Sequence, residues 1–103
     1  MVVTALFKAK TGKAKELLAL LEKTARASWA EPGVTAYAVH QVNGGTDVFF
    51  NVEVYQSQAA FKTHLDTPHV KAIILALDDL LAEPAQILQM NNIFPGISAK
   101  SDL

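Results

Sequence analysis

Cysteine is absent from the chain of 103 residues, and this absence removes several kinds of chemistry at once. Without thiols the chain forms no disulfide, offers no thiolate to a metal ion and has no cysteine nucleophile. The apolar residues 1–7 are followed at once by Lys8 and Lys10, whereas a signal peptide carries its charges before a longer apolar stretch. We therefore expect a cytoplasmic protein.

Charge of one sign and long hydrophobic runs are also scarce. Nine basic and ten acidic residues give a formal net charge of −1, with no block of like charge. A nucleic-acid partner needs a concentrated basic face, so we expect none. No apolar run approaches the roughly 20 residues of a membrane span, so we expect no membrane partner.

The hydrophobic pattern predicts four strands and three helices in one α+β domain. Alternating apolar residues predict the strands, and apolar residues at helical spacing predict the helices. Ser57 and Thr67 are predicted N-caps, and both glycines of the 43–47 hairpin loop are expected to have positive φ. The order along the chain is strand 2–9, helix 12–31, strands 34–42 and 48–55, helices 58–65 and 68–82, and strand 85–91. This is the ferredoxin-like β-α-β-β-α-β order. The domain spans residues 1–103, with 92–103 as a C-terminal tail.

Both faces of the predicted sheet are at least partly apolar, which favours a homodimer. Helices cover one face of such a sheet, and the other face of a monomer is normally polar. Residues 48–55 instead place valines and Phe50 on one face and aromatic residues on the other. Packing two open faces together would bury this patch. The alternative is that the tail, with Ile93, Phe94 and Ile97, folds over the open face.

Histidines are the first candidates for chemistry. His64 and His69 are five residues apart with Pro68 between them, which is not the spacing that places two metal ligands on one helical face, and we predict no metal site. Either ring can act as an acid or base near neutral pH. Alternatively, each is a satisfied cap or a surface residue.

Polar residues on the third strand are the second group. Asn51 and Glu53 interrupt an apolar strand and must be hydrogen-bonded or face a pocket. Asn51 could hold a substrate oxygen, and Glu53 could be a base or a structural partner. Trp29 and Tyr37 could line a pocket for a flat ring, although aromatic residues more often belong to a core or an interface. No phosphate loop or nucleotide signature is present, so no cofactor is evident.

Several segments together resemble the antibiotic-biosynthesis-monooxygenase domain, and they extend over nearly the whole chain. These segments are Lys10-Thr11-Gly12-Lys13, Glu31-Pro32-Gly33, Tyr37 with His40, Glu53-Val54-Tyr55, Ala59-Ala60-Phe61 and the run from His64 to Ala72. The last run and the ending Ile93-Phe94-Pro95-Gly96-Ile97 resemble the quinol monooxygenase branch.

This resemblance implies a dimeric ferredoxin-like α/β barrel and oxygenase chemistry without metal or flavin. In the polyketide-oxidising members an Asn, a Trp and a Tyr mark the site. Here the corresponding residues are Asn51, Tyr55 and Phe61, so only the Asn matches and polyketide oxidation is in doubt. Haem degradation is rejected because the residues of that site are replaced by Ala5, His64 and Ile74. A further branch of the family, which isomerises a phosphorylated sugar-like signal, shares the run from Thr67 to Lys71.

The resulting hypothesis is a cofactor-independent monooxygenase that uses dioxygen to oxidise a quinol-like or aromatic small molecule. The alternatives are an isomerase of a small phosphorylated or oxygenated metabolite, and a non-catalytic small-molecule-binding dimer. The pocket is expected between the sheet and the two C-terminal helices. The predicted catalytic residues are His64 and Asn51, and the predicted substrate-binding residues are His69, Tyr55, Tyr37, Trp29, Glu53 and Phe61.

Overall fold

A computed structural model describes residues 1–103. The element order is β1 (Val2–Lys8), α1 (Ala14–Trp29), β2 (Val34–Gln41), β3 (Val48–Tyr55), α2 (Gln58–Leu65), α3 (Pro68–Leu80) and β4 (Gln86–Met90). A short 3-10 helix, η1 (Ala99–Ser101), lies in the tail. None of the helices has the length and apolar character that a membrane crossing requires.

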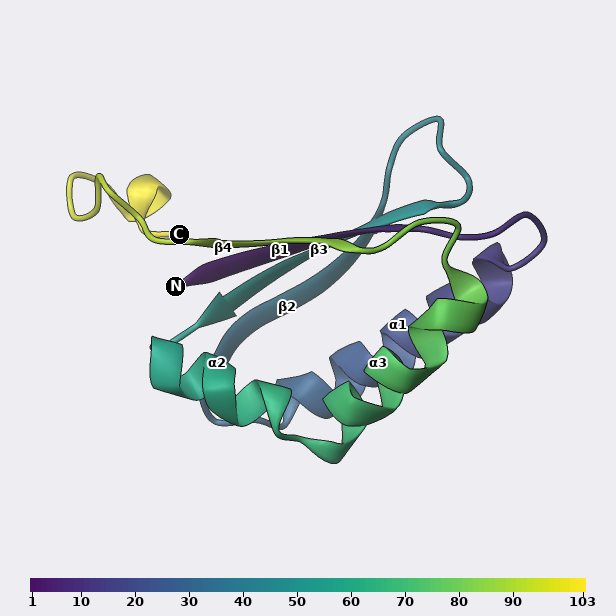
Figure 1. Cartoon of the computed structure of the whole chain (residues 1–103). Coiled ribbons are helices and arrows are strands. Elements are labelled where there is room, and N and C mark those ends of the chain that lie inside the picture. Colours follow the sequence, from purple (N-terminus) through teal and green to yellow (C-terminus); the bar gives the residue numbers. More distant parts are fainter.

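The four strands form one antiparallel sheet in the order β2-β3-β1-β4. All three helices lie on one side of this sheet, as Figure 1 shows. The element order and the layers confirm the predicted ferredoxin-like α+β fold.

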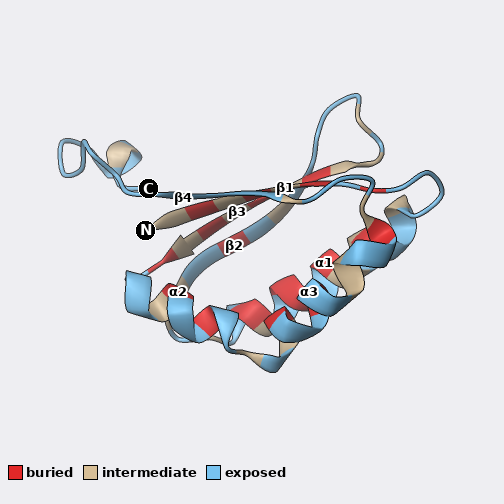
Figure 2. Ribbon diagram, in the orientation of Figure 1, coloured by how far each residue is buried: buried red, intermediate tan, exposed pale blue.

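The main core lies between the sheet and the two longer helices, and Figure 2 shows buried segments in both layers. Leu17 and Leu21 recur at helical spacing along α1 and are fully buried. They pack with Phe7 of β1, Phe49 of β3 and Ile73 of α3. This packing fixes the distance between the helices and the sheet around the site described below.

Local signals set the break between α2 and α3. Ser57 caps α2 by accepting a hydrogen bond from the Ala60 amide, and Thr67 caps α3 by accepting one from the Val70 amide. Pro68 is suited to the first turn of α3 because the missing N–H has no partner to lose there. The chain therefore turns sharply between Leu65 and Pro68, which places the two helix ends together.

The face of the sheet away from the helices is mostly apolar and is not covered by the tail. The register places Val2, Leu6, Phe50, Val52, Val54, Leu88 and Met90 on this open face. The tail extends beyond the end of the strands in Figure 1, and Ile93 is 94% exposed. The idea that the tail folds over the open face is therefore wrong for this chain.

Candidate functional site

A cavity of about 100 Å³ lies between the sheet and the helices. Its walls are largely apolar, with Val3, Ala5, Phe7 and Ile87 from the sheet and Phe61, Leu65, Val70, Ile73, Ile74 and Leu77 from the helices. Thr24, Tyr37, Glu53 and His64 add polar atoms. Leu65, Ile74 and Ile87 are exposed, so the cavity opens to solvent beside them. Apolar walls with a few converging polar groups are typical of a small-molecule site.

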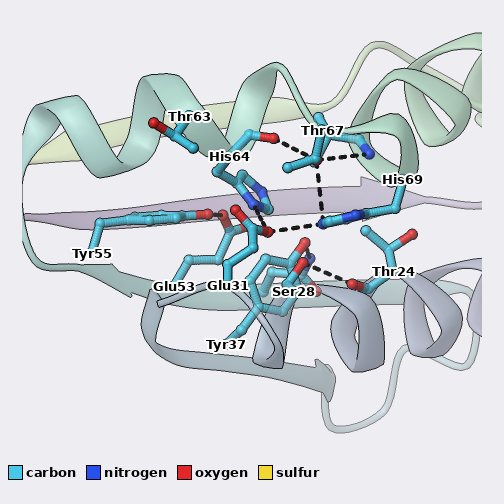
Figure 3. Close-up of polar contacts among 12 residues, drawn as sticks. Thr24, Ser28, Glu31, Tyr37, Glu53, Tyr55, Thr63, His64, Thr67 and His69 are labelled. Atoms are coloured by element: carbon cyan, nitrogen blue, oxygen red, sulfur yellow. Dashed lines mark hydrogen bonds and ion pairs between the residues drawn. The ribbon is translucent and has the colours of Figure 1, made fainter. Parts of the chain in front are cut away.

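Three titratable side chains meet at the side of this cavity, as Figure 3 shows. One carboxylate oxygen of Glu31, Oε2, lies 2.7 Å from Nδ1 of His64 and 2.8 Å from Nε2 of His69. The side chain of His64 is 4% exposed, that of Glu31 13% and that of His69 20%. Hydrogen bonds to a charged group are stronger than those between neutral groups. Water screens the two bonds to Glu31 little, because all three side chains are largely buried.

Each member of the Glu31–His64–His69 cluster comes from a helix end. Glu31 follows α1, His64 lies in the last turn of α2 and His69 in the first turn of α3. The Thr67 hydroxyl donates to the His64 carbonyl at 2.6 Å and lies 3.3 Å from Nε2 of His69. The cap of α3 thus also fixes the spacing of the two histidines.

Gly33 brings the Glu31 segment against α2. A Cβ atom at Gly33 would lie 2.6 Å from Cβ of Ala60, a distance that no side chain tolerates. The Gly33 carbonyl also accepts a hydrogen bond from the Gln56 amide at 2.9 Å. The glycine of the Glu-Pro-Gly segment is therefore required for the close approach that lets Glu31 reach His64.

The hydrogen bonds of His64 define which ring nitrogen is free. The Glu31 carboxylate is a hydrogen-bond acceptor, so the Nδ1 of His64 must be the donor. We therefore assign the proton of neutral His64 to Nδ1. The other nitrogen, Nε2, has no hydrogen-bond partner in the chain, and the residue lines the cavity. Rings of Tyr37, Tyr55 and Phe61 surround the imidazole, with centroids 5.2–6.4 Å away. His64 thus presents an oriented, unpaired basic nitrogen in a largely apolar setting.

Glu53 is the second carboxyl group at the cavity. It is buried on β3 and accepts a hydrogen bond from the Tyr55 hydroxyl at 2.5 Å. Burial raises the pKa of Glu53 above its ordinary value of 4.5, and the Tyr55 hydrogen bond and nearby His64 only partly oppose this. Burial and the Glu53 charge raise the pKa of Tyr55, so its hydroxyl stays protonated.

Asn51 lies beside the cavity rather than in its wall. Its Nδ2 donates to the Tyr37 hydroxyl at 3.3 Å, and its Oδ1 is buried without a partner. Burial, and then the Glu53 charge, raise the pKa of Tyr37. Buried polar atoms are normally paired, so the unpaired Oδ1 of Asn51 is available to accept a hydrogen bond next to the site.

The structure gathers most of the residues that the sequence singled out, and it separates one. Tyr37, Glu53, Phe61 and His64 line the cavity. Asn51, Tyr55 and His69 contact these lining residues or Glu31. Trp29 lies outside: it is 63% exposed, and its indole N–H donates to the Tyr37 carbonyl at 2.8 Å.

Sequence reasoning missed the role of Glu31, although its segment belonged to the resemblance. No acidic partner follows the histidines in the sequence, because their partner lies 33 residues before His64. A local signal was present. An acidic residue just after a helix is disfavoured by the helix dipole. A position that breaks a local rule often serves a site.

Comparison with known proteins places this chain in a family. The family model described as antibiotic biosynthesis monooxygenase matches residues 1–75, which include Glu31, His64 and His69. The chain belongs to the antibiotic biosynthesis monooxygenase family. This confirms the resemblance seen in the sequence.

Individual proteins and solved structures are also similar to most of this chain. YcnE of Bacillus subtilis, provisionally named a monooxygenase, is 27% identical over 89 residues, which are 86% of this chain and 94% of YcnE. The uncharacterised protein sll1783 of Synechocystis is 32% identical over 87 residues, which are 84% of this chain but only 59% of that protein. The crystal structure of PA3566 from Pseudomonas aeruginosa aligns with a TM-score of 0.84 at 26% identity, covering 90% of this chain and 93% of that one.

Proposed function

We propose that this protein is a cofactor-independent monooxygenase that oxidises a quinol-like aromatic molecule with dioxygen, with His64 as the base. The observation that carries the proposal is the unpaired Nε2 of His64 at an apolar cavity, with Nδ1 held by Glu31. A carboxylate that orients an imidazole in this way also stabilises the imidazolium that forms when the ring takes a proton.

The chemistry needs no external reductant. His64 takes the proton of a ring hydroxyl, and the resulting anion gives electrons to dioxygen. One oxygen atom joins a ring carbon, and the other leaves as water with two hydrogens from the substrate. A hydroquinone and dioxygen therefore yield a hydroxyquinone and water, and His64 returns its proton. The protein supplies the base, orientation and exclusion of water.

The lining of the cavity favours an aromatic substrate over a phosphorylated one. No lysine or arginine lines it, whereas anionic phosphate needs a cationic or N–H-rich site. Engineered apolar cavities of roughly 150 Å³ hold benzene, so this cavity with its open mouth suits about one ring. The isomerase alternative is therefore the weaker candidate.

Asn51 and the remaining polar groups would orient the substrate. We assign the unpaired Oδ1 of Asn51 to a substrate hydroxyl after a small shift of its side chain, and Tyr37, Tyr55, Glu53, Phe61 and His69 to shaping and polarising the site. Glu53 lines the cavity, so its carboxyl group can form a hydrogen bond with a substrate hydroxyl.

We further propose that the protein acts as a homodimer joined through the open face of the sheet. Half-buried Phe50, Val52 and Val54 and exposed Leu88 and Met90 would otherwise leave an apolar patch in water. Monomeric proteins rarely carry a large patch of this kind.

Oxygen consumption tests the proposed reaction. Metal-free protein is mixed with a panel of substituted hydroquinones in an oxygen electrode, and products made under isotope-labelled dioxygen are analysed by mass spectrometry. We expect dioxygen uptake above the spontaneous rate and one labelled oxygen atom per product. Dioxygen uptake at the background rate with every quinol, together with conversion of a sugar phosphate to its isomer, would favour the isomerase instead.

A further inference from the structure

The Glu31–His64–His69 cluster contains more potential metal ligands than a single catalytic base requires. Its three donor atoms, two imidazole nitrogens and a carboxylate oxygen, lie within 4.8 Å of one another. Two histidines and one carboxylate are the ligand set of open zinc sites, and imidazole also suits cobalt, nickel and copper. We propose that Glu31, His64 and His69 bind one divalent transition-metal ion, of the zinc type, per chain.

The geometry is close to what an ion needs. Tetrahedral zinc holds its donors at about 2.1 Å, which places the donor atoms about 3.4 Å apart. Glu31 Oε2 lies 2.7 and 2.8 Å from the two nitrogens, so these two gaps must widen by about 0.6–0.7 Å. The two nitrogens lie within 4.8 Å of each other and must end about 3.4 Å apart. Glu31 lies between α1 and β2, outside both elements. The histidines are already spaced by Thr67.

Access and protonation also fit an ion. His69 and Glu31 are partly exposed, so an ion can enter from the solvent side, while His64 closes the site toward the cavity. Both nitrogens carry their protons toward Glu31 in the metal-free form, and a ligand nitrogen must lose its proton. The proton of a neutral His64 therefore moves to Nε2 when the ion binds Nδ1.

This tautomer shift links the metal to the proposed reaction. If His64 is the base, a proton on Nε2 occupies the one unpaired ring nitrogen of this cavity-lining residue, so the ion inhibits turnover. That consequence rests on the proposed function, whereas binding of the ion does not. Binding measured without substrate therefore tests this proposal separately from the oxygenase proposal.

The test is titration of metal-free protein with Zn²⁺ by calorimetry and with Co²⁺ by visible absorption. We expect one ion per chain and a Co²⁺ spectrum of nitrogen and oxygen ligation. Glu31→Gln and His69→Ala should each weaken binding at least tenfold. His40→Ala, which removes the histidine paired with Phe50 on the open face, should leave binding unchanged.

The His69→Ala variant tests the site even if the Glu31→Gln variant does not fold. His69 is partly exposed, so His69→Ala should fold even if Glu31→Gln does not, and circular dichroism checks this. No saturable binding to the wild-type protein would overturn the proposal. Binding that is unchanged in a folded His69→Ala variant, or that is lost in His40→Ala, would overturn it as well.

Discussion

Replacing Glu31 by Gln tests the arrangement around which the site is built. The substitution keeps the size of the side chain but removes the charge that both histidines contact at 2.7 and 2.8 Å. Hydrogen bonds to a charged group contribute about 1.5–3 kcal/mol each, and the glutamine oxygen retains part of this. We therefore expect the free energy of unfolding to fall by about 1–3 kcal/mol. For a domain of this size the loss corresponds to roughly 5–15 °C in Tm.

The effect on turnover should be larger than the effect on folding. Without the carboxylate, the His64 ring loses its fixed tautomer and orientation, and misplacement of a reacting group by about 1 Å can cost about 100-fold in rate. Denaturant unfolding and steady-state kinetics measure the two effects. The matched control is Glu16→Gln, because Glu16 is exposed and its nearest cation, Lys13, lies 3.9 Å away. This control should change stability by less than about 0.5 kcal/mol. A Glu31→Gln variant with wild-type stability and turnover would refute the reasoning.

Three further predictions concern the sheet and its buried groups. Val52→Glu would place a charge in the proposed dimer interface, so light scattering should show about twice the chain mass for the wild type and monomer or aggregate for the variant; an intact, stable variant dimer would contradict the interface. Glu53→Gln keeps an acceptor for the Tyr55 hydroxyl but carries no charge. Because the pKa of Glu53 is raised in the folded state, the wild type loses stability as pH rises above 4.5. Denaturant unfolding should therefore show that Glu53→Gln gains stability relative to the wild type as pH rises. A stability difference that does not change with pH would contradict the effect of burial. Tyr37 and Tyr55 have pKa values raised above 10.0, so tyrosinate absorbance should appear only together with alkaline unfolding. The free energy of unfolding should fall as pH rises above 10.0. Ionisation of both tyrosines near pH 10 in the folded protein would contradict this.

Much of the fold was predictable because its signals are local. The starts of α2 and α3 fall at the predicted residues, since Ser57 and Thr67 cap the helices with their own side chains. The end of α3 was set two residues too late. There Leu81 leaves the helix to pair with Ala9, a contact 72 residues away in the chain. Of the two hairpin glycines, only Gly44 has positive φ, so the prediction for Gly45 was wrong.

The site was only partly predictable, because its central carboxylate is recruited by tertiary structure. His64 stood out as a possible acid or base, Glu53 as a polar residue in an apolar strand and Tyr37 as an aromatic residue. All three line the cavity. The convergence of Glu31 with His64 and His69 depends on the close approach at Gly33, which no residue spacing reveals. The expectation of no metal site rested on the separation of five residues between His64 and His69. That separation does not reveal that Glu31 joins them in the Glu31–His64–His69 cluster.

The most direct test of the account is the turnover of His64→Ala with the quinol that gives the fastest dioxygen uptake. If His64 is the base, kcat/KM should fall by about 100-fold or more, while His40→Ala keeps wild-type activity. The substrate should still bind to His64→Ala, since the apolar walls of the cavity remain. Wild-type turnover by a folded His64→Ala variant would contradict the central claim that the Nε2 of His64 takes the substrate proton.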